Sequence, residues 1–338
     1  MSIKENSEAI FSESPGKIAL RTLRKDKRSI ISLTILGFIV AISLLAPIYS
    51  HFIAHTNPFN SSLDATIHVG GKTVPVLEAS TTGLGLGVTP IGPTWNPSSY
   101  FLGADGQGRD VMARVLYGGR NTLLIGTSAG IICIVLSLLI GVIAGYRKGW
   151  VDAILSRLLD VIWAFPVYLL AISLSVVLLT SGLTIGFIHL GPGSFALPIL
   201  IIGIVYIPYV ARPIRAQVLS LREREFVRAA VGIGAKESTI IFREILPNII
   251  PSVLVFIPII IALCMLTESA LSFLSIGVQP PSASWGTIIN DGLALLYTRP
   301  WVGIAPGLLI VLTAASLNLY GDAVRDALDP KTRSRGDA

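Results

Sequence analysis

The stretch EFVRAAVGIGAKESTIIFREILPN, residues 225–248, is the most polar segment between two long apolar runs of the chain. The runs on either side, 196–214 and 249–276, have the composition of membrane-spanning helices. About 20 apolar residues suffice for a helix to cross the ~30 Å hydrocarbon core of a bilayer. The quoted stretch is therefore predicted to be a loop that joins two membrane spans.

The composition of the whole chain supports this reading. Its 338 residues are 52% hydrophobic and only 14% charged, with a mean hydropathy of +0.72, whereas soluble domains carry about 25% charged residues. We predict an all-α integral membrane protein with six transmembrane helices. The predicted spans are 30–53, 122–146, 153–179, 196–214, 249–276 and 302–320.

The basic residues indicate which loops face the cytoplasm. Of the 26 Lys and Arg residues, 21 lie in the N-terminal tail, the link between spans two and three, the quoted loop and the C-terminal tail. Cytoplasmic loops of membrane proteins carry such an excess. Both termini and the quoted loop are predicted to be cytoplasmic, and the net charge of +6 gives no support for nucleic-acid binding.

No catalytic, cofactor or metal site is predicted. His51 and His55 have the spacing of a zinc pair, but Phe52 stands where a metalloprotease has its general-base glutamate. Thr66 occupies the first glycine position of a phosphate-loop match that ends at residue 73. A membrane enzyme is therefore disfavoured.

The quoted loop is predicted to fold as two short helices. The pattern favours an amphipathic helix over about 218–233, ended by Gly234 in a left-handed cap, and a second helix over 237–245. Pro247 suits the first turn of the following span, because its missing N–H is no loss there. On these grounds alone, the loop is either a binding element or an ordinary amphipathic connector.

The spacing of the loop resembles the cytoplasmic loop of ABC-importer permeases. That pattern is Glu-Ala-Ala, three residues, Gly, nine residues, Ile, one residue, Leu-Pro; here Arg228 replaces the Glu and Glu244 replaces the Ile. In the family, the loop docks in a groove of a separate ATPase. The resemblance assigns ATPase coupling to Glu225, Arg228, Ala229, Ala230, Gly234, Glu244, Leu246 and Pro247.

Four further segments are similar to the C-type permease subunit of dipeptide, oligopeptide and nickel importers. They are FLGADGQGRDVMARVLYGGRNTLLIG (101–126), DVIWAFPVYLLAI (160–172), ESALSFLSIGVQPPSASWG (268–286) and NLYGDAVRDALDPKTR (318–333). The resemblance implies a type I ABC-importer permease fold with a cytoplasmic coupling-helix loop. It also implies a multi-pass protein of a bacterial or archaeal inner membrane.

The implied partners are a homologous second permease subunit, two cytoplasmic ABC ATPase subunits and an extracytoplasmic substrate-binding protein, together with membrane lipid. ATP and Mg are expected in the ATPase subunits, and no cofactor is expected on this chain. The expected function is half of an ATP-driven import pathway for peptides. The alternative is an ATPase-independent secondary transporter or channel. Dipeptide, oligopeptide, nickel complex and glutathione all remain open as cargo.

The chain divides by these criteria into five parts. They are a cytoplasmic tail (1–29), the first span (30–53), an extracytoplasmic loop with an interfacial helix (54–121), a permease core with the coupling loop 218–247 (122–322), and a cytoplasmic tail (323–338). The outer loop is too poor in large apolar residues to bury a core. Its interfacial helix, with an Asp110–Arg114 pair, either contacts the substrate-delivery protein or acts as a scaffold on the membrane surface; the segment 57–95 has no counterpart in the resemblance.

Charged and polar groups inside the spans are costly and mark candidate sites. Glu268, Ser272 and Asn318 are predicted to line the translocation path or gate, the alternative being hydrogen bonds that pack helices. Arg157 and Asp160 are predicted to pair. Small residues of span two, Gly126, Gly130 and Gly141, fit close helix packing.

Overall fold

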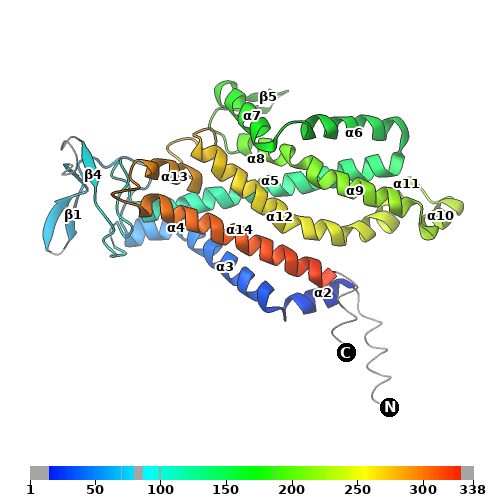
Figure 1. Cartoon of the computed structure of the whole chain (residues 1–338), viewed down its shortest axis with the longest axis horizontal. Coiled ribbons are helices and arrows are strands. Elements are labelled where there is room, and N and C mark those ends of the chain that lie inside the picture. The colour runs from blue at the N-terminus through cyan, green and yellow to red at the C-terminus, as the bar shows by residue number, and fades with distance from the viewer. Residues whose placement is uncertain (1–14, 70, 80–86, 99, 187, 329–338) are drawn as a thin grey trace, which may run out of the picture.

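The protein is an elongated bundle of helices (Figure 1). The computed structural model describes residues 15–69, 71–79, 87–98, 100–186 and 188–328. The short strands between residues 66 and 90 lie at one end of the long axis, and helix α10 (Glu225–Gly232) lies at the opposite end (Figure 1). The predicted outer loop and the predicted coupling loop are therefore at opposite ends of the bundle.

Four helices are long and apolar enough to cross a membrane. They are α3 (Lys27–Leu44), α5 (Val111–Arg147), α12 (Leu246–Phe273, continuous with the helical turns from Glu237) and α14 (Trp301–Leu328). Two bent pairs also pass this test: α6 (Gly149–Trp163) with α7 (Val167–Ser181), and α8 (Ala196–Val205) with α9 (Ile207–Arg222). Counting each pair as one span gives up to six spans in the described chain, in agreement with the predicted fold class.

The third and fourth spans are broken, whereas we predicted continuous helices. The α6/α7 pair bends by 88° and the α8/α9 pair by 43°. Pro166 lies within the first break in an extended conformation (ψ 130°), and Pro208 lies in the first turn after the second break. Proline removes a backbone donor and its ring clashes with the preceding turn, so both breaks follow from local sequence.

Helix α5 forms the centre of the bundle and packs against α8, α9 and α12. Its glycines permit this close packing. A Cβ on Gly126 would lie 2.1 Å from Met265 Cγ, and one on Gly141 would lie 2.8 Å from the Ala211 carbonyl oxygen. Gly130 is similarly close to Ile261. The packing role predicted for these glycines is confirmed.

The predicted interfacial helix is not a separate element. Helix α5 begins at Val111, where the Asp110 side chain accepts a hydrogen bond from Ala113 N at 3.1 Å, and continues without a break to Arg147. No proline interrupts residues 111–121, so the helix that starts in the outer segment passes directly into the span. The helix predicted to lead into span two is therefore continuous with that span, and the domain boundary at residue 121 stays a prediction.

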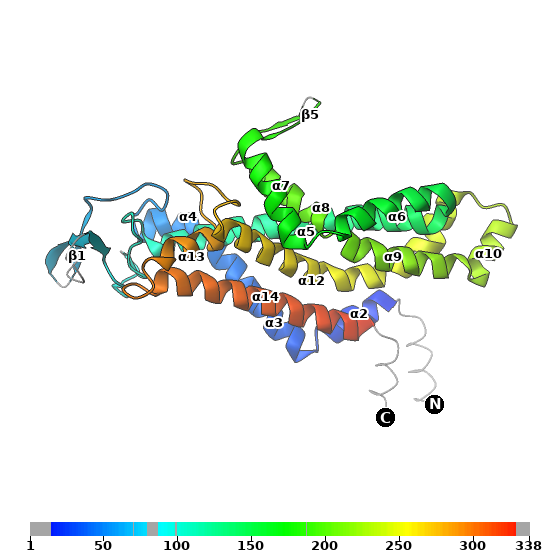
Figure 2. The same cartoon turned by 45° about the horizontal axis from the view of Figure 1, so that its top comes forward.

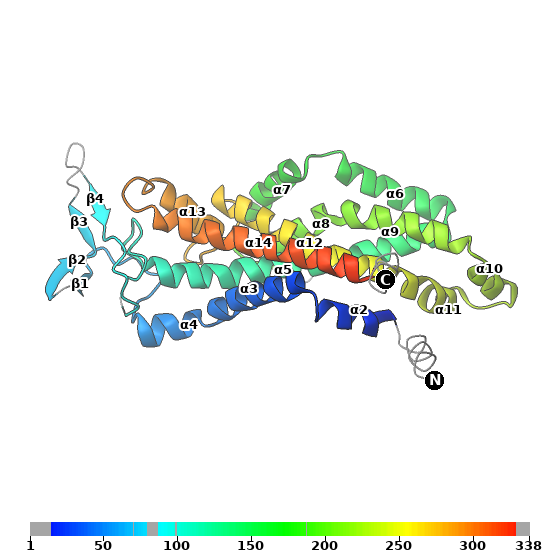
Figure 3. The ribbon, with the colours of Figure 1, turned by 60° about the horizontal axis from the view of Figure 1, so that its bottom comes forward.

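The first span is shorter than predicted. Helix α3 ends at Leu44, and the chain continues through α4 (Ala46–Ile48) and the π-helical turn η1 (Tyr49–Ile53). Before it, α2 (Pro15–Leu23) packs against α14, so part of the predicted N-terminal tail is helical (Figure 3). Helix α14 likewise extends six residues into the predicted C-terminal tail, to Leu328. The rest of both tails, 1–14 and 329–338, lies outside the described residues.

The outer segment contains two antiparallel hairpins, which we did not predict. Strand β1 (Thr66–Val69) pairs with β2 (Lys72–Pro75), and β3 (Leu77–Ala79) pairs with β4 (Val88–Pro90). Contrary to our expectation, the segment buries a small core, formed by the three side chains Val76, Tyr100 and Ala104. One short helix, α13 (Trp285–Leu293), lies at the same end of the bundle (Figure 1).

A third hairpin follows α7. Strands β5 (Leu183–Ile185) and β6 (Ile188–Leu190) pair with Leu183 opposite Leu190. This hairpin projects away from the bundle (Figure 2). It was not predicted, because the apolar residues on both sides resemble the neighbouring spans in composition.

Candidate coupling surface

The quoted stretch forms a helix, a turn and a second helix, which we call the coupling segment (225–245). It consists of α10, α11 (Glu237–Ile240) and the π-helical turn η2 (Ile241–Ile245), which leads directly into α12. Gly234 has φ +76° at the turn, as predicted. The first helix is shorter than the predicted 218–233, because α9 ends at Arg222 and Arg224 is extended (ψ 150°) before α10 begins.

The inner face of the coupling segment is packed against the bundle. Val227, Ile240 and Ile245 are at most 2% exposed, and Ala230 packs against the same core. Burying a side chain of this size stabilises by about 1.5–3 kcal/mol. The segment is therefore held to the membrane helices as one packed unit.

The outer surface of the coupling segment exposes four large apolar side chains among its charged ones. Phe226, Val231, Ile233 and Phe242 are 42%, 57%, 86% and 66% exposed. Apolar surface of this kind marks an interaction site when several large side chains occur in one region. The coupling segment thus presents a surface that a protein partner can cover.

The predicted coupling residues are divided between these two surfaces. Five are exposed: Glu225, Arg228, Ala229, Gly234 and Pro247. Three are half-buried: Ala230, Glu244 and Leu246. Pro247 lies in the first turn of α12, as predicted. Their contact with an ATPase stays a prediction.

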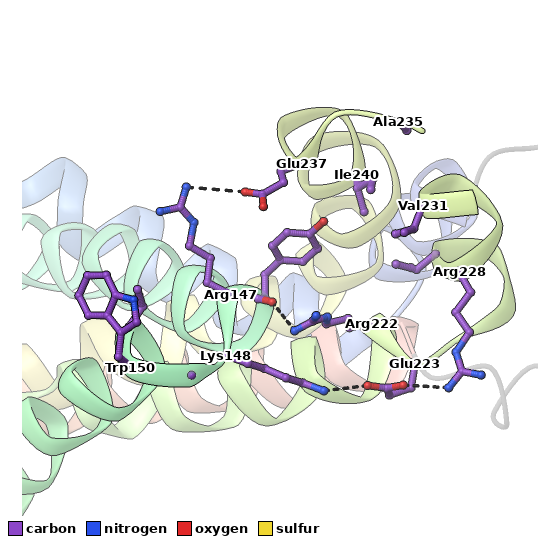
Figure 4. A pocket seen from close by; sticks show the side chains of 14 residues that line it. Arg147, Lys148, Trp150, Arg222, Glu223, Arg228, Val231, Ala235, Glu237 and Ile240 are labelled. Carbon is purple, nitrogen blue, oxygen red and sulfur yellow. Dashed lines mark hydrogen bonds and ion pairs between the residues drawn. The ribbon is translucent and has the colours of Figure 1, made fainter. Parts of the chain in front are cut away.

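A charged link fastens the coupling segment to the link between α5 and α6 (Figure 4). Glu223 Oε1 accepts a hydrogen bond from Lys148 Nζ at 2.8 Å, and Glu223 Oε2 accepts one from Arg228 Nη2 at 2.9 Å. Hydrogen bonds from Lys148 and Arg228 lower the pKa of Glu223 to about 2. Arg228, which stands at the family's glutamate position, thus pairs with a glutamate of its own chain.

Two further contacts join the end of α5 to the coupling segment and its approach. Arg222 Nη1 donates to the Tyr146 carbonyl oxygen at 2.7 Å, and Arg147 lies 3.7 Å from Glu237. A cavity of about 780 Å³ lies between these groups (Figure 4). Sequence reasoning missed this arrangement, because its only signal was basic residues in two loops that are distant in sequence.

Helix α6 is joined to α9 by ion pairs. Arg215 donates two hydrogen bonds to Asp152, at 2.5 and 2.6 Å, and Arg212 donates to Asp160 at 2.7 Å. The predicted pair of Arg157 and Asp160 is confirmed at 3.7 Å, but Arg212 makes the shorter contact. These ion pairs fix α6 to α9, the helix that precedes the coupling segment.

A buried charge cluster joins α13 to the start of α5. It lies at the end of the bundle that carries the two hairpins of the outer segment, which we call the hairpin end. Asp105 accepts a hydrogen bond from Arg109 Nε at 2.7 Å, and Asp291 of α13 accepts one from Arg114 Nη2 at 2.9 Å. The predicted Asp110–Arg114 pair is wrong. Asp110 instead caps α5, while Arg114 reaches an acidic side chain far away in sequence.

Glu268 is fully buried in α12 and is surrounded by hydroxyl groups. Ser272 Oγ donates to Glu268 Oε1 at 2.7 Å and accepts a hydrogen bond from Val278 N at 3.0 Å. Ser269 Oγ donates to Glu268 Oε2 at 3.4 Å. Asn318 is exposed on α14, and within the described chain no hydrogen bond joins it to Glu268. These hydrogen bonds lie within α12 and the turn that follows it, and both a role in the pathway and a role in helix packing stay predictions.

Two family models match the chain. Residues 137–334 match "Binding-protein-dependent transport system inner membrane component", and residues 14–65 match "N-terminal TM domain of oligopeptide transport permease C". Together they cover most of the described spans.

Full-length relatives are also similar. The dipeptide transport system permease protein DppC of Alkalihalophilus pseudofirmus is 33% identical over 95% of this chain and 91% of its own length. The oligopeptide transport system permease protein OppC of Bacillus subtilis is 33% identical over 94% and 90%. The glutathione transport system permease protein GsiD of Pectobacterium atrosepticum is 38% identical over 70% and 74%.

A solved structure shares the fold. A chain of the MetNI methionine ABC transporter, in an inward-facing conformation, aligns with a TM-score of 0.52 at 18% identity. The alignment covers 64% of this chain and 97% of that one. The likeness supports the type I permease fold predicted from the motifs.

Proposed function

The chain belongs to the family of binding-protein-dependent transport system inner membrane components, and we propose that it forms half of the translocation pathway of an ATP-driven peptide importer. It is a transport permease that spans the membrane several times. We further propose that ATP and Mg are bound, and ATP hydrolysed, in separate partner subunits.

The observation that carries this proposal is the coupling segment. It combines an inner face that is packed into the bundle with exposed apolar side chains such as Ile233, which is 86% exposed. The segment lies at the end of the molecule opposite the two hairpins of the outer segment (Figure 1). An ATPase that covers this surface would contact a segment that is packed against the membrane helices, so displacing the segment would displace those helices.

The contacts of the coupling segment define how a displacement would spread. The segment leads directly into α12, and ion pairs through Glu223 and Glu237 join it to the end of α5. Because ion pairs join α6 to α9, a displacement of the segment would act on α5, α6, α9 and α12 together. Moving a two-state equilibrium from 1:99 to 99:1 needs about 5.5 kcal/mol of differential binding, which ATP binding in the partners would supply.

The proposed assembly contains a homologous second permease, two cytoplasmic ABC ATPases and an extracytoplasmic substrate-binding protein. The excess of Lys and Arg in the termini and the coupling loop supports a cytoplasmic location for both ends of the chain. The hairpins of the outer segment would then face the binding protein. We assign the protein to a bacterial or archaeal inner membrane.

Peptides are the proposed cargo because the similar permeases are named for dipeptide, oligopeptide and glutathione transport. These three cargo classes share a peptide backbone and a free carboxylate. Selection among them is assigned to the binding protein, since the permease has few charged groups within its spans.

Reconstitution into vesicles tests the proposal. The complete assembly is expected to import peptide only when ATP and the binding protein are supplied. Uptake by the purified chain alone, driven by an ion gradient without ATP, would instead support the secondary transporter or channel.

A further inference from the structure

A groove that the proposed function does not use lies between α3, α5, α12 and α14. It has a volume of about 590 Å³ and is lined mainly by apolar side chains, including Leu36, Leu124, Met265 and Leu317. This volume lies within the ~300–1,000 Å³ range of small-molecule sites. Figure 3 shows α3 and α14 alongside α5 and α12 in this part of the bundle.

Close helix packing forms the floor and one end of the groove. Gly126 brings α5 so near to α12 that a Cβ would lie 2.1 Å from Met265 Cγ, and Met265 lines the groove. At the hairpin end, a Cβ on Gly119 would lie 2.5 Å from Ser43 Oγ, which holds α3 against α5. The groove is thus bounded by helices in fixed contact.

Arg120 lies at the hairpin end of the groove and is exposed. Within the described chain, no acidic side chain forms an ion pair with it. Residues 121–146, which follow it, contain no charged side chain and extend for about 39 Å. That length exceeds the ~30 Å of hydrocarbon, so Arg120 falls at the level of the lipid headgroups.

The depth of the groove matches one leaflet. Its lining on α5 extends from Arg120 to Ser128, about 12 Å along the helix. Its lining on α3 extends over the same length, from Leu44 back to Leu36. Half of the hydrocarbon core is about 15 Å thick. A lipid whose phosphate is at Arg120 can therefore place an acyl chain along the whole groove.

We propose that this groove binds an anionic phospholipid from the leaflet at the hairpin end. The phosphate would pair with Arg120, and one acyl chain would lie against Leu124 and Met265. The choice of an anionic lipid follows from the unbalanced guanidinium charge, since basic pockets between membrane helices attract such headgroups. Identifying that leaflet as the outer one rests on the orientation in the proposed function.

Lipid titration of the complete transporter tests this site. The complex, purified in detergent, is titrated with phosphatidylglycerol, and the bound lipid is counted by native mass spectrometry. Arg120→Gln is expected to weaken binding about fivefold, while Arg120→Lys keeps the charge and retains binding. Ser128→Phe fills the groove without a charge change and is expected to abolish lipid binding.

Lys72→Gln is the matched control. It removes the same charge from exposed strand β2, outside the groove, and should leave binding unchanged. Equal affinity in all variants would overturn the proposal, as would equal binding of phosphatidylcholine.

A photocrosslinker at Leu124 should capture phospholipid; capture of the second permease would instead make the groove a subunit interface. Because binding is measured without ATP or transport, a failure here is distinct from a failure of the proposed function.

Discussion

Gly234 allows a direct test of the turn within the coupling segment. Its φ of +76° is left-handed, and its own N–H donates to the Val231 carbonyl oxygen at 3.0 Å. A Cβ built on Gly234 meets nothing within 4 Å, so the first side-chain carbon lies in open space. Gly234→Val therefore adds backbone strain alone.

The expected magnitude follows from that conformation. A side chain in the left-handed region costs roughly 1–2 kcal/mol, and β-branched residues are especially disfavoured there. This strain lowers the population of the native turn by a factor of about 5–30. The apparent affinity for the ATPase should fall by up to the same factor, because only the native turn is competent to dock.

The assay compares ATPase binding and ATP-dependent peptide uptake in vesicles. Gly232→Val is the control, since it places the same side chain two residues earlier on α10, where the backbone is helical and the built Cβ also meets nothing. Membrane insertion should be normal for both variants. Equal ATPase affinity and uptake for Gly234→Val and Gly232→Val would refute the reasoning.

Three further changes are predicted to have separable effects. Asp105→Ala removes one of the two acidic partners of buried Arg109 and Arg114 and leaves only the partly exposed Asp291 to pair with both. It should lower the free energy of unfolding by about 3 kcal/mol, the low end of the cost of breaking a buried ion pair, measured as a lower thermal midpoint. Gly126→Val overpacks the contact with Met265 and should cost about 1–3 kcal/mol, whereas an unchanged midpoint would contradict the packing described. The lowered pKa of Glu223 means that its ion pairs are present above its unfolded pKa and are lost only as the pH falls toward about 2, so ATPase binding should show no titration of this group between pH 5 and 8. Glu223→Gln should weaken binding equally across that range; a loss confined to one end would count against the link.

The spans and the loop chemistry were predictable because they depend on local patterns. Long apolar runs identified the four membrane-length helices and the two bent pairs of the described chain, and the left-handed turn at Gly234 follows from a glycine between two amphipathic segments. The prolines at the two bends, Pro166 and Pro208, are also visible in the sequence. We did not predict the bends, because hydropathy alone treats each apolar run as one straight helix.

The contacts that connect the site were not predictable. Arg114 was expected to pair with Asp110 four residues away, but it reaches Asp291 across the fold. Lys148 and Glu223 are likewise brought together only by the packing of α5 against α9. Such pairs depend on tertiary arrangement, and a single sequence carries no local signal for them.

The central claim is that an ATPase covers the coupling segment and moves the bundle through it. Site-specific crosslinking from position 233, where Ile233 is 86% exposed, tests this most directly in the native membrane. We predict a crosslink to an ATPase subunit whose yield changes when ATP is bound. A transporter that remains active and yields no ATPase crosslink from this position or from Phe226 and Phe242 would contradict the account.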